Sequence, residues 1–336
     1  MAARASSWTA LGTVLLLGAG LLTGCAQRAP EVTGEILTHY QRDGVRQALG
    51  EPVEDQRCGL PGDGCEQAFQ RGRIFWSPSS GAAHLVAGPL LDWYTGHGGP
   101  EGDYGWPAES LETEARGEDG VIRTRFTAMT LAHHPERAGL VMAEDQALGA
   151  GDALVLGDSQ LLDGDHDDSW VSRSIRALGW TPHYRARGGI GVVADGSKDH
   201  YGSYLDGVAG GRWVLPAGNP GLVYVQGSGN DVGVAPERLR EGTARLLRTL
   251  KEAYPQSRIV LSGVISKKGA TARDRVADAL EQVARAEGVE FVPLRGKITE
   301  WHAEGDLVDG KHFSAPTGHE KMAAAYTPYL RERLAR

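Results

Sequence analysis

Four short motifs in the second half of the chain carry residue types that together could transfer an acyl group. In chain order they are Gly157-Asp158-Ser159, Gly189-Ile190-Gly191, Gly229-Asn230-Asp231 and Asp309-Gly310-Lys311-His312. They supply a hydroxyl nucleophile, backbone N–H donors, an amide donor and an acid–base pair. Gly-Asp-Ser and Asn-Asp are each common turn sequences. All four in this order, at strand ends or in loops before helices, indicate serine-based acyl transfer.

The predicted catalytic residues are Ser159, His312 and Asp309. A serine hydroxyl is a poor nucleophile until a base removes its proton. The spacing of Asp309-x-x-His312 lets the carboxylate bond one imidazole nitrogen while the other faces Ser159. We therefore expect His312 to be the general base and Asp309 to orient it.

The tetrahedral intermediate of acyl transfer also needs hydrogen-bond donors for its oxyanion. The backbone N–H of Ser159, a glycine N–H from Gly189 or Gly191, and the amide of Asn230 are the candidates. Removing one such donor typically slows an enzyme by ~10²–10³-fold. Between the two glycines, we expect Gly191 to be the donor.

The elements that would position these residues alternate between strand-like and helix-like segments from Gly151 onward. This alternation is typical of a parallel sheet flanked by helices. The expected strands are Ala153–Leu156, Leu222–Gln226, Arg258–Val264 and Val289–Pro293. The expected helices are Pro236–Tyr254, Thr271–Glu287, one from near Trp170 and one from near Thr317. A doubly wound sheet binds ligands at the carboxyl ends of its strands, where Ser159 and Asn230 follow directly.

The four motifs resemble those of the SGNH (GDSL-like) hydrolase family, over roughly residues 152–335. The resemblance implies an α/β fold with a flavodoxin-like, three-layer, doubly wound parallel sheet. It also implies that Ser159, His312 and Asp309 are catalytic, and that no metal or organic cofactor is needed. Two positions depart from the family pattern. Gln160 occupies the position of the leucine in the Gly-Asp-Ser-Leu motif that gives the family its name. Ser228 occupies the position of the first glycine in the family's Gly-x-Asn-Asp motif.

The N-terminus has the features of a bacterial export signal. Arg4 precedes a short apolar stretch that cannot span a bilayer about 30 Å thick. This stretch ends in Leu22-Thr-Gly-Cys25, which resembles a lipobox. The resemblance implies a signal peptide over residues 1–24, lipid attachment at Cys25, and a tether up to residue 35. An ordinary cleaved signal peptide is the alternative.

Two cysteines remain if Cys25 carries lipid. In an exported protein, Cys58 and Cys65 would most simply close one small disulfide loop. Two free thiols are the alternative. A metal site is not expected there, because no further cysteine or histidine crowds the segment.

Residues 36–142 contain an imperfect internal repeat. Leu49-Gly-Glu-Pro52 recurs as Tyr104-Gly-Trp-Pro107, and each unit continues to a phenylalanine strand. This pattern resembles the LGFP repeat of exported cell-envelope proteins, which implies a small domain of short strands and helices associated with the cell wall. Four side chains could form a glycan-binding platform or pack the domain core instead: Trp76, His84, Trp93 and Trp106.

A glycine-rich insertion from Asp195 to Pro220 separates the second and third motifs. At this length it is unusual for a connection, and such loops often form lids or binding loops. Its aromatic residues Tyr201, Tyr204 and Trp213 are therefore the predicted substrate-binding residues, with a purely structural excursion as the alternative.

Charge and motifs together define the expected function. A net charge of −8 without a basic run argues against nucleic-acid binding. We expect a monomeric, exported, lipid-anchored serine esterase, with its hydrolase domain over residues 151–336. Its substrates would be acyl or acetyl esters of cell-envelope glycans or glycolipids. An O-acyltransferase using the same site, and a wall-binding scaffold with little activity, are the alternatives.

Overall fold

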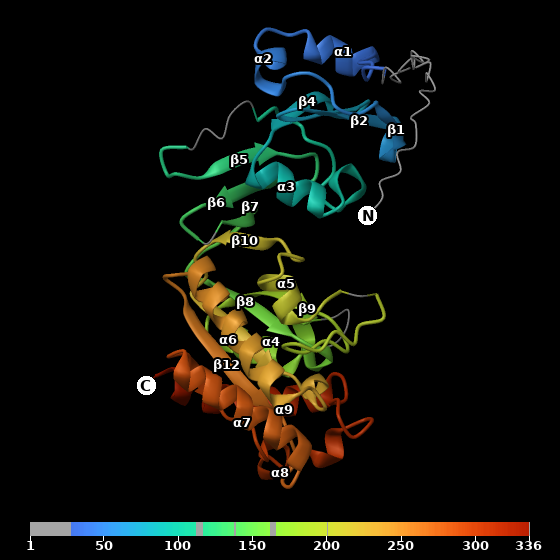
Figure 1. The fold of residues 1–336 in the computed structure, drawn as a ribbon. Coiled ribbons are helices and arrows are strands. Elements are labelled where there is room, and N and C mark those ends of the chain that lie inside the picture. The colour runs from blue at the N-terminus through green and yellow to red at the C-terminus, as the bar shows by residue number, and fades with distance from the viewer. Residues whose placement is uncertain (1–27, 112–116, 138, 162–165, 200, 336) are drawn as a thin grey trace, which may run out of the picture.

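The computed structural model describes residues 28–335 except 112–116, 138, 162–165 and 200 (Figure 1). The expected signal peptide and lipid-bearing Cys25 lie outside the described residues. Within them, no helix is both long and apolar enough to cross a membrane.

The N-terminal part begins with two short helices and an antiparallel sheet of four strands in the order β1-β2-β3-β4. Its elements are α1 (Gly34–Tyr40), α2 (Val45–Leu49), β1 (Arg57–Leu60), β2 (Gly64–Phe69), β3 (Gly72–Ser77), β4 (Gly81–Val86) and α3 (Pro89–Gly96). Cys58 and Cys65 face each other across β1 and β2 and form the predicted disulfide.

Most of the four residues considered for a glycan platform pack inside this part of the molecule. His84 and Trp106 are buried, and the indole N–H of Trp106 donates to the carbonyl of Pro61. Trp93 stacks on His97, and Trp76 packs against a small hydrophobic cluster around α1. The packing interpretation therefore accounts for His84 and Trp106.

A second sheet connects the two halves of the molecule. It has the order β10-β7-β6-β5, with β5 (Ile122–Arg125), β6 (Thr130–His134), β7 (Leu140–Leu148) and β10 (Leu215–Gly218). Strands β5, β6 and β7 are antiparallel neighbours, whereas β10 comes from the predicted insertion and pairs in parallel with β7. This sheet crosses the boundary that the sequence placed between residues 142 and 151.

The C-terminal part is built on a parallel sheet of five strands in the order β13-β12-β11-β8-β9. The strands are β8 (Asp152–Gly157), β9 (Thr181–Ala186), β11 (Leu222–Gly227), β12 (Arg258–Val264) and β13 (Glu290–Val292). Counted within this sheet, the order is 2-1-3-4-5, as in flavodoxin. The predicted doubly wound fold is confirmed.

Helices cover both faces of this sheet (Figure 1). They are α4 (Trp170–Ala177), α5 (Tyr204–Val208), α6 (Pro236–Ala253), α7 (Thr271–Ala286), α8 (Lys297–Glu300) and α9 (Thr317–Leu334). Side chains alternate between faces along each strand. Leu154 and Leu156 of β8 accordingly join the core that includes α6 and α7, while Ala153 and Val155 join the core that includes α4 and α9.

The aromatic residues of the insertion lie in the core. Tyr204 is completely buried in α5, Trp213 is buried beside it, and Tyr201 packs against the indole of Trp213. The indole N–H of Trp213 donates to the carbonyl of Tyr201. Burial of Tyr204 and Trp213 argues against the prediction that they bind substrate, because the insertion folds onto the sheet and packs their rings into its core, whereas Tyr201 is only partly buried.

Candidate active site

The candidate site lies where the strand order of the parallel sheet reverses. Ser159 opens a short 3-10 turn directly after β8, and Asn230 lies in a similar turn after β11. β8 and β11 are neighbours, and the chain leaves them toward opposite edges of the sheet. Ligands of open α/β sheets bind in the crevice at such a switch point. The topology therefore brings two of the predicted motifs to one crevice.

A hydrogen-bonded chain of three side chains forms one wall of this crevice. Ser159 Oγ lies 2.7 Å from His312 Nε2, and His312 Nδ1 lies 2.7 Å from Asp309 Oδ2. This arrangement fits the imidazole tautomer with its proton on Nδ1, donated to Asp309. The three predicted catalytic residues are thus together, in the geometry that activates a serine hydroxyl.

The carboxylate of Asp309 also accepts hydrogen bonds from the backbone of its own loop. Its Oδ1 accepts the backbone N–H groups of Lys311 and His312, at 2.9 and 2.8 Å. The His312 backbone N–H, the His312 side chain and the Lys311 backbone N–H lower the pKa of Asp309 well below its usual range. Asp309 therefore stays charged at any pH at which His312 can act as a base.

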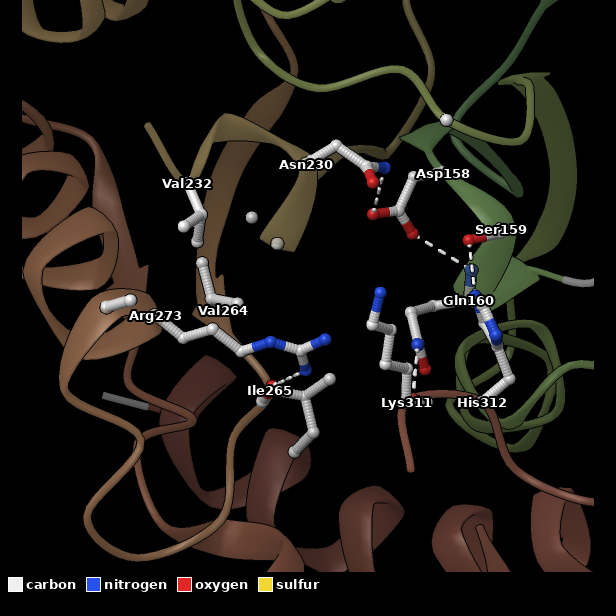
Figure 2. Close-up of a pocket in the computed structure, with 14 residues that line it drawn as sticks. Asp158, Ser159, Gln160, Asn230, Val232, Val264, Ile265, Arg273, Lys311 and His312 are labelled. Carbon is white, nitrogen blue, oxygen red and sulfur yellow. Dashed lines mark hydrogen bonds between the residues drawn. The ribbon is translucent and has the colours of Figure 1, made fainter. Parts of the chain in front are cut away.

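A cavity of about 490 Å³ opens beside Ser159 and His312 (Figure 2). It is lined by Asp158, Ser159, Gln160, Gly189, Gly227, Gly229, Asn230, Val232, Val264, Ile265, Ala272, Arg273, Lys311 and His312. The volume is within the usual range for small-molecule sites, ~300–1,000 Å³. Its lining includes residues from all four predicted motifs.

Of the two glycines predicted as oxyanion donors, Gly189 is the one that lines this cavity. The N–H of Gly191, which the sequence analysis favoured, already donates to the carbonyl of Ala194 at 2.7 Å. A Cβ atom at Gly191 would lie 2.5 Å from a carboxylate oxygen of Asp231. Gly191 thus allows the close approach of Asp231, and the structure favours Gly189 as the oxyanion donor.

Asn230 lies at the cavity with its amide turned toward Asp158 (Figure 2). Its Nδ2 donates to the carbonyl of Ile190 at 2.8 Å and makes a longer contact of 3.4 Å with Asp158 Oδ2. The bond to Ile190 fixes the amide plane. The contact with Asp158 is the longer and weaker of the two.

Comparisons with known proteins agree with this geometry. The model of the GDSL-like Lipase/Acylhydrolase family matches residues 155–321, and the LGFP repeat model matches residues 49–102. The chain therefore carries an LGFP repeat and a GDSL-like lipase/acylhydrolase domain. The protein is an ester-hydrolysing serine hydrolase. No curated protein sequence matches the chain.

Several solved structures resemble the hydrolase domain. A carbohydrate esterase family 2 enzyme with a carbohydrate-binding domain, from Corynascus thermopiles, has 17% identity, covers 55% of this chain and 68% of its own, and gives a TM-score of 0.42. A family two carbohydrate esterase from Cellvibrio japonicus has 20% identity, 56% and 63% coverage, and a TM-score of 0.43. A variant of an acetyl xylan esterase from Geobacillus stearothermophilus has 14% identity, 55% and 96% coverage, and a TM-score of 0.42.

The hydrolase also contains a buried carboxylate, Asp158, whose role the sequence did not reveal. It accepts hydrogen bonds from the Ser228 hydroxyl at 2.6 Å, the Gln160 backbone N–H at 2.9 Å and the Gln226 amide at 3.1 Å. Burial raises the pKa of Asp158, and the hydrogen bonds from Ser228 and Gln160 counteract that effect. Asp158 thus joins the serine motif to the asparagine motif.

Ser228 replaces the glycine of the family pattern with a hydroxyl that this network uses. Besides donating to Asp158, its Oγ accepts the backbone N–H of Asn230 at 3.0 Å. It therefore fixes the turn that positions Asn230.

Asp231, next to Asn230, holds the glycine motif in place. Its completely buried carboxylate accepts the N–H groups of three consecutive residues, namely Val192, Val193 and Ala194. Charge-assisted bonds of this kind are among the stronger ones in proteins. Asp231 is therefore a positioning residue for the segment that carries Gly189.

Two cationic side chains in the cavity of the hydrolase were also missed. Arg273 comes from the first turn of α7, and Lys311 lies within the catalytic loop. No sequence signal points to Arg273, because it is one of several arginines on an amphipathic helix. Among the residues that the structure describes, no three His, Cys, Asp or Glu side chains gather as a metal centre would require.

Proposed function

We propose that the protein is an exported, lipid-anchored esterase that hydrolyses acyl esters of cell-envelope glycans or glycolipids. Ser159 acts as nucleophile, His312 as general base and Asp309 as the group that orients His312. The observation that carries this proposal is the continuous hydrogen-bonded chain from Ser159 through His312 to Asp309, on the wall of an open cavity.

In the first half of the reaction, Ser159 Oγ attacks the carbonyl carbon of the ester while His312 Nε2 takes the hydroxyl proton. Negative charge moves onto the carbonyl oxygen, which accepts bonds from the N–H groups of Ser159 and Gly189 and from the Asn230 amide. When the tetrahedral intermediate collapses, the C–O bond to the alcohol breaks and His312 gives its proton to the leaving oxygen.

In the second half, water replaces the alcohol. His312 removes a proton from the water as its oxygen attacks the acyl-serine, and the same donors hold the second oxyanion. Collapse breaks the bond between the acyl carbon and Ser159 Oγ, and His312 returns the proton to that oxygen. The products are a free carboxylic acid and the regenerated hydroxyl.

The first test is hydrolysis of 4-nitrophenyl acetate and butyrate by the purified protein and by Ser159→Ala. Turnover should be lost in the variant, and the acetate-to-butyrate ratio then bounds the acyl pocket. Ser159-independent turnover, or none in a folded protein, would contradict the proposal. Added glycan acceptors that divert the acyl group into a new ester would instead indicate a transferase.

Export and anchoring are tested separately. The sequence Leu22-Thr-Gly-Cys25 and the LGFP repeat match support a location at the cell envelope. Cys25→Ser should release the protein from the membrane fraction, and intact-mass measurement should show that it has lost the acyl chains. A wild-type protein without lipid would refute the anchor and leave the esterase proposal intact.

A further inference from the structure

The cavity beside Ser159 has a positive charge on two of its sides. Arg273 reaches in from α7, across the cavity from Ser159, and Lys311 extends into it from the catalytic loop (Figure 2). The chain as a whole carries a net charge of −8. A local positive charge in an acidic protein attracts anions to that place.

Neither cation forms a salt bridge within the described part of the chain, and the charge of Arg273 acts only at a distance on the buried Asp158. The Arg273 guanidinium donates to the carbonyl of Ile265 at 3.0 Å, and no ion pair joins either Arg273 or Lys311 to a carboxylate there. Asp158 is the one carboxylate in the cavity lining, and its oxygens already accept bonds from Ser228, Gln160 and Gln226. The remaining donors of the two cations are left for a ligand.

The backbone holds Arg273 in this position. A Cβ atom at Gly229 would lie 3.3 Å from the guanidinium, so a glycine there lets the group lie against the turn that carries Asn230. The bond to Ile265 fixes one edge of the guanidinium. Arginine held in this way presents a planar set of N–H donors suited to a carboxylate or phosphate.

We propose that the substrate carries an acidic group close to its scissile ester, and that Arg273 and Lys311 bind this group. The inference rests on the proposed esterase function and names the substrate class of that same site. The acidic group belongs either to the acyl part, as in a dicarboxylic acid half-ester, or to the alcohol part. Apolar side chains from Val232, Val264 and Ile265 complete the wall around it.

The test compares charged and neutral esters of matched size. On the acyl side, 4-nitrophenyl monosuccinate is paired with 4-nitrophenyl butyrate. On the alcohol side, 4-acetoxybenzoate is paired with its methyl ester. Each is assayed with wild type, Arg273→Gln and Lys311→Met, with Ser159→Ala as the blank. Ratios of variant to wild type remove differences in intrinsic reactivity.

For the anionic member of one pair, kcat/KM should fall by ~10-fold or more in Arg273→Gln, as expected for a hydrogen bond to a charged group. The neutral member should change little. Arg273→Lys and Lys311→Arg should retain part of the preference, and raising the salt concentration should weaken it. Arg240→Gln removes a charge from an exposed ion pair with Glu237 on α6 and should have no effect.

Which pair responds identifies the part of the substrate that carries the acidic group. If kcat/KM in Arg273→Gln falls equally for charged and neutral esters, or does not fall for either anionic ester, this inference is overturned and the esterase function still stands. If no ester shows Ser159-dependent turnover, the proposed function falls and this inference falls with it. Thermal unfolding of each variant checks that it is folded.

Discussion

At the scale of single residues, Asp309 combines two kinds of contact in the catalytic loop. One oxygen accepts hydrogen bonds from two backbone N–H groups, and the other accepts a hydrogen bond from the imidazole of His312. An amide at this position could still accept the backbone bonds through its oxygen. Its NH₂ group could not accept the hydrogen bond of His312 Nδ1–H, so the imidazole would favour the tautomer with its proton on Nε2.

We therefore predict that Asp309→Asn lowers kcat by ~10²–10⁴-fold with little change in stability. Steady-state kinetics on 4-nitrophenyl butyrate and an unfolding curve measure both. Asp306→Asn is the matched control, because Asp306 bonds Lys321 instead of the catalytic histidine. A loss of kcat in Asp306→Asn as large as in Asp309→Asn would refute the specific role of Asp309.

Ser228 is a second residue whose effect can be measured alone. Its hydroxyl donates to the buried Asp158 and accepts the backbone N–H of Asn230. Ser228→Ala removes the shortest hydrogen bond to this buried carboxylate and leaves Oδ2 with only the longer contact to Asn230, a loss that typically costs ~1–3 kcal/mol. The free energy of unfolding should fall by that amount at neutral pH, and kcat should fall because the turn bearing Asn230 is loosened. An unchanged unfolding midpoint and an unchanged kcat would show that the hydroxyl has no such role.

At the scale of elements, α6 packs against the segment that carries the glycine motif. A Cβ atom at Gly242 would lie 2.2 Å from a methyl group of Val193. Val193 belongs to the turn that Asp231 holds, so the spacing between helix and turn depends on this glycine.

Gly242→Ala should destabilise the protein by ~1–3 kcal/mol through overpacking, even though alanine favours a helix. It should also lower kcat, because Gly189 shifts with the displaced turn. Gly96→Ala, at the end of α3, is the matched control: a Cβ atom there meets nothing within 4 Å. Chemical denaturation and ester hydrolysis provide the two readouts. A stabilising Gly242→Ala would contradict the packing argument.

Helix α9 docks on α4 through a buried histidine. The backbone N–H of Trp170 donates to His319 Nδ1 at 3.1 Å, and burial lowers the pKa of His319 to about 4. The side chain of His319 is buried although it lies on a helix near the catalytic loop. The neutral imidazole completes the cap of α4.

This shift gives a pH dependence with a definite sign. In the unfolded chain His319 binds a proton near its ordinary pKa of 6.5, whereas in the folded protein it does so only near 4. Between these values the unfolded state holds more protons, so acidification favours unfolding. His319→Asn keeps an acceptor for Trp170 but cannot titrate. Its free energy of unfolding should therefore fall less than that of wild type from pH 7 to pH 4, whereas parallel curves would exclude His319 as the cause.

At the scale of the whole molecule, the sheet formed by β5, β6, β7 and β10 makes the two halves depend on each other. Met142 and Leu148 of β7 are buried in the same core as helix α6. Arg137 donates to the carbonyls of Gly218 and Ala253, at 3.0 and 2.9 Å. Removing the N-terminal part would expose the edge of β10 and open this core.

A chain that begins at Gly151 should therefore be less stable than one that begins at Ala26, and should unfold at lower denaturant concentration. A chain that begins at Arg137 keeps β7 and should recover part of the loss. Denaturant unfolding followed by tryptophan fluorescence measures all three. Equal midpoints would show that the hydrolase part folds independently of the shared sheet.

The features that depend on local pattern could be predicted from the amino-acid sequence. Apolar runs separated by amphipathic segments specify a doubly wound sheet, because parallel strands buried on both faces need continuous apolar residues. Ser159 and Asn230 could be placed at the carboxyl edge because each follows a strand directly. Asp309 and His312 could be paired because they lie three residues apart in one loop.

The features that depend on burial and on contacts between distant segments could not be predicted, because they follow from how the chain folds in three dimensions. Gly189 replaces Gly191 as the glycine at the cavity because Asp231 occupies the space beside Gly191. Tyr204 and Trp213 are buried in the core because the insertion folds back onto the sheet. Arg273 reaches the cavity because α7 begins there, and nothing in the composition of that helix distinguishes it from its neighbours. A residue's type and spacing show which chemistry it can do, whereas packing decides which groups it meets.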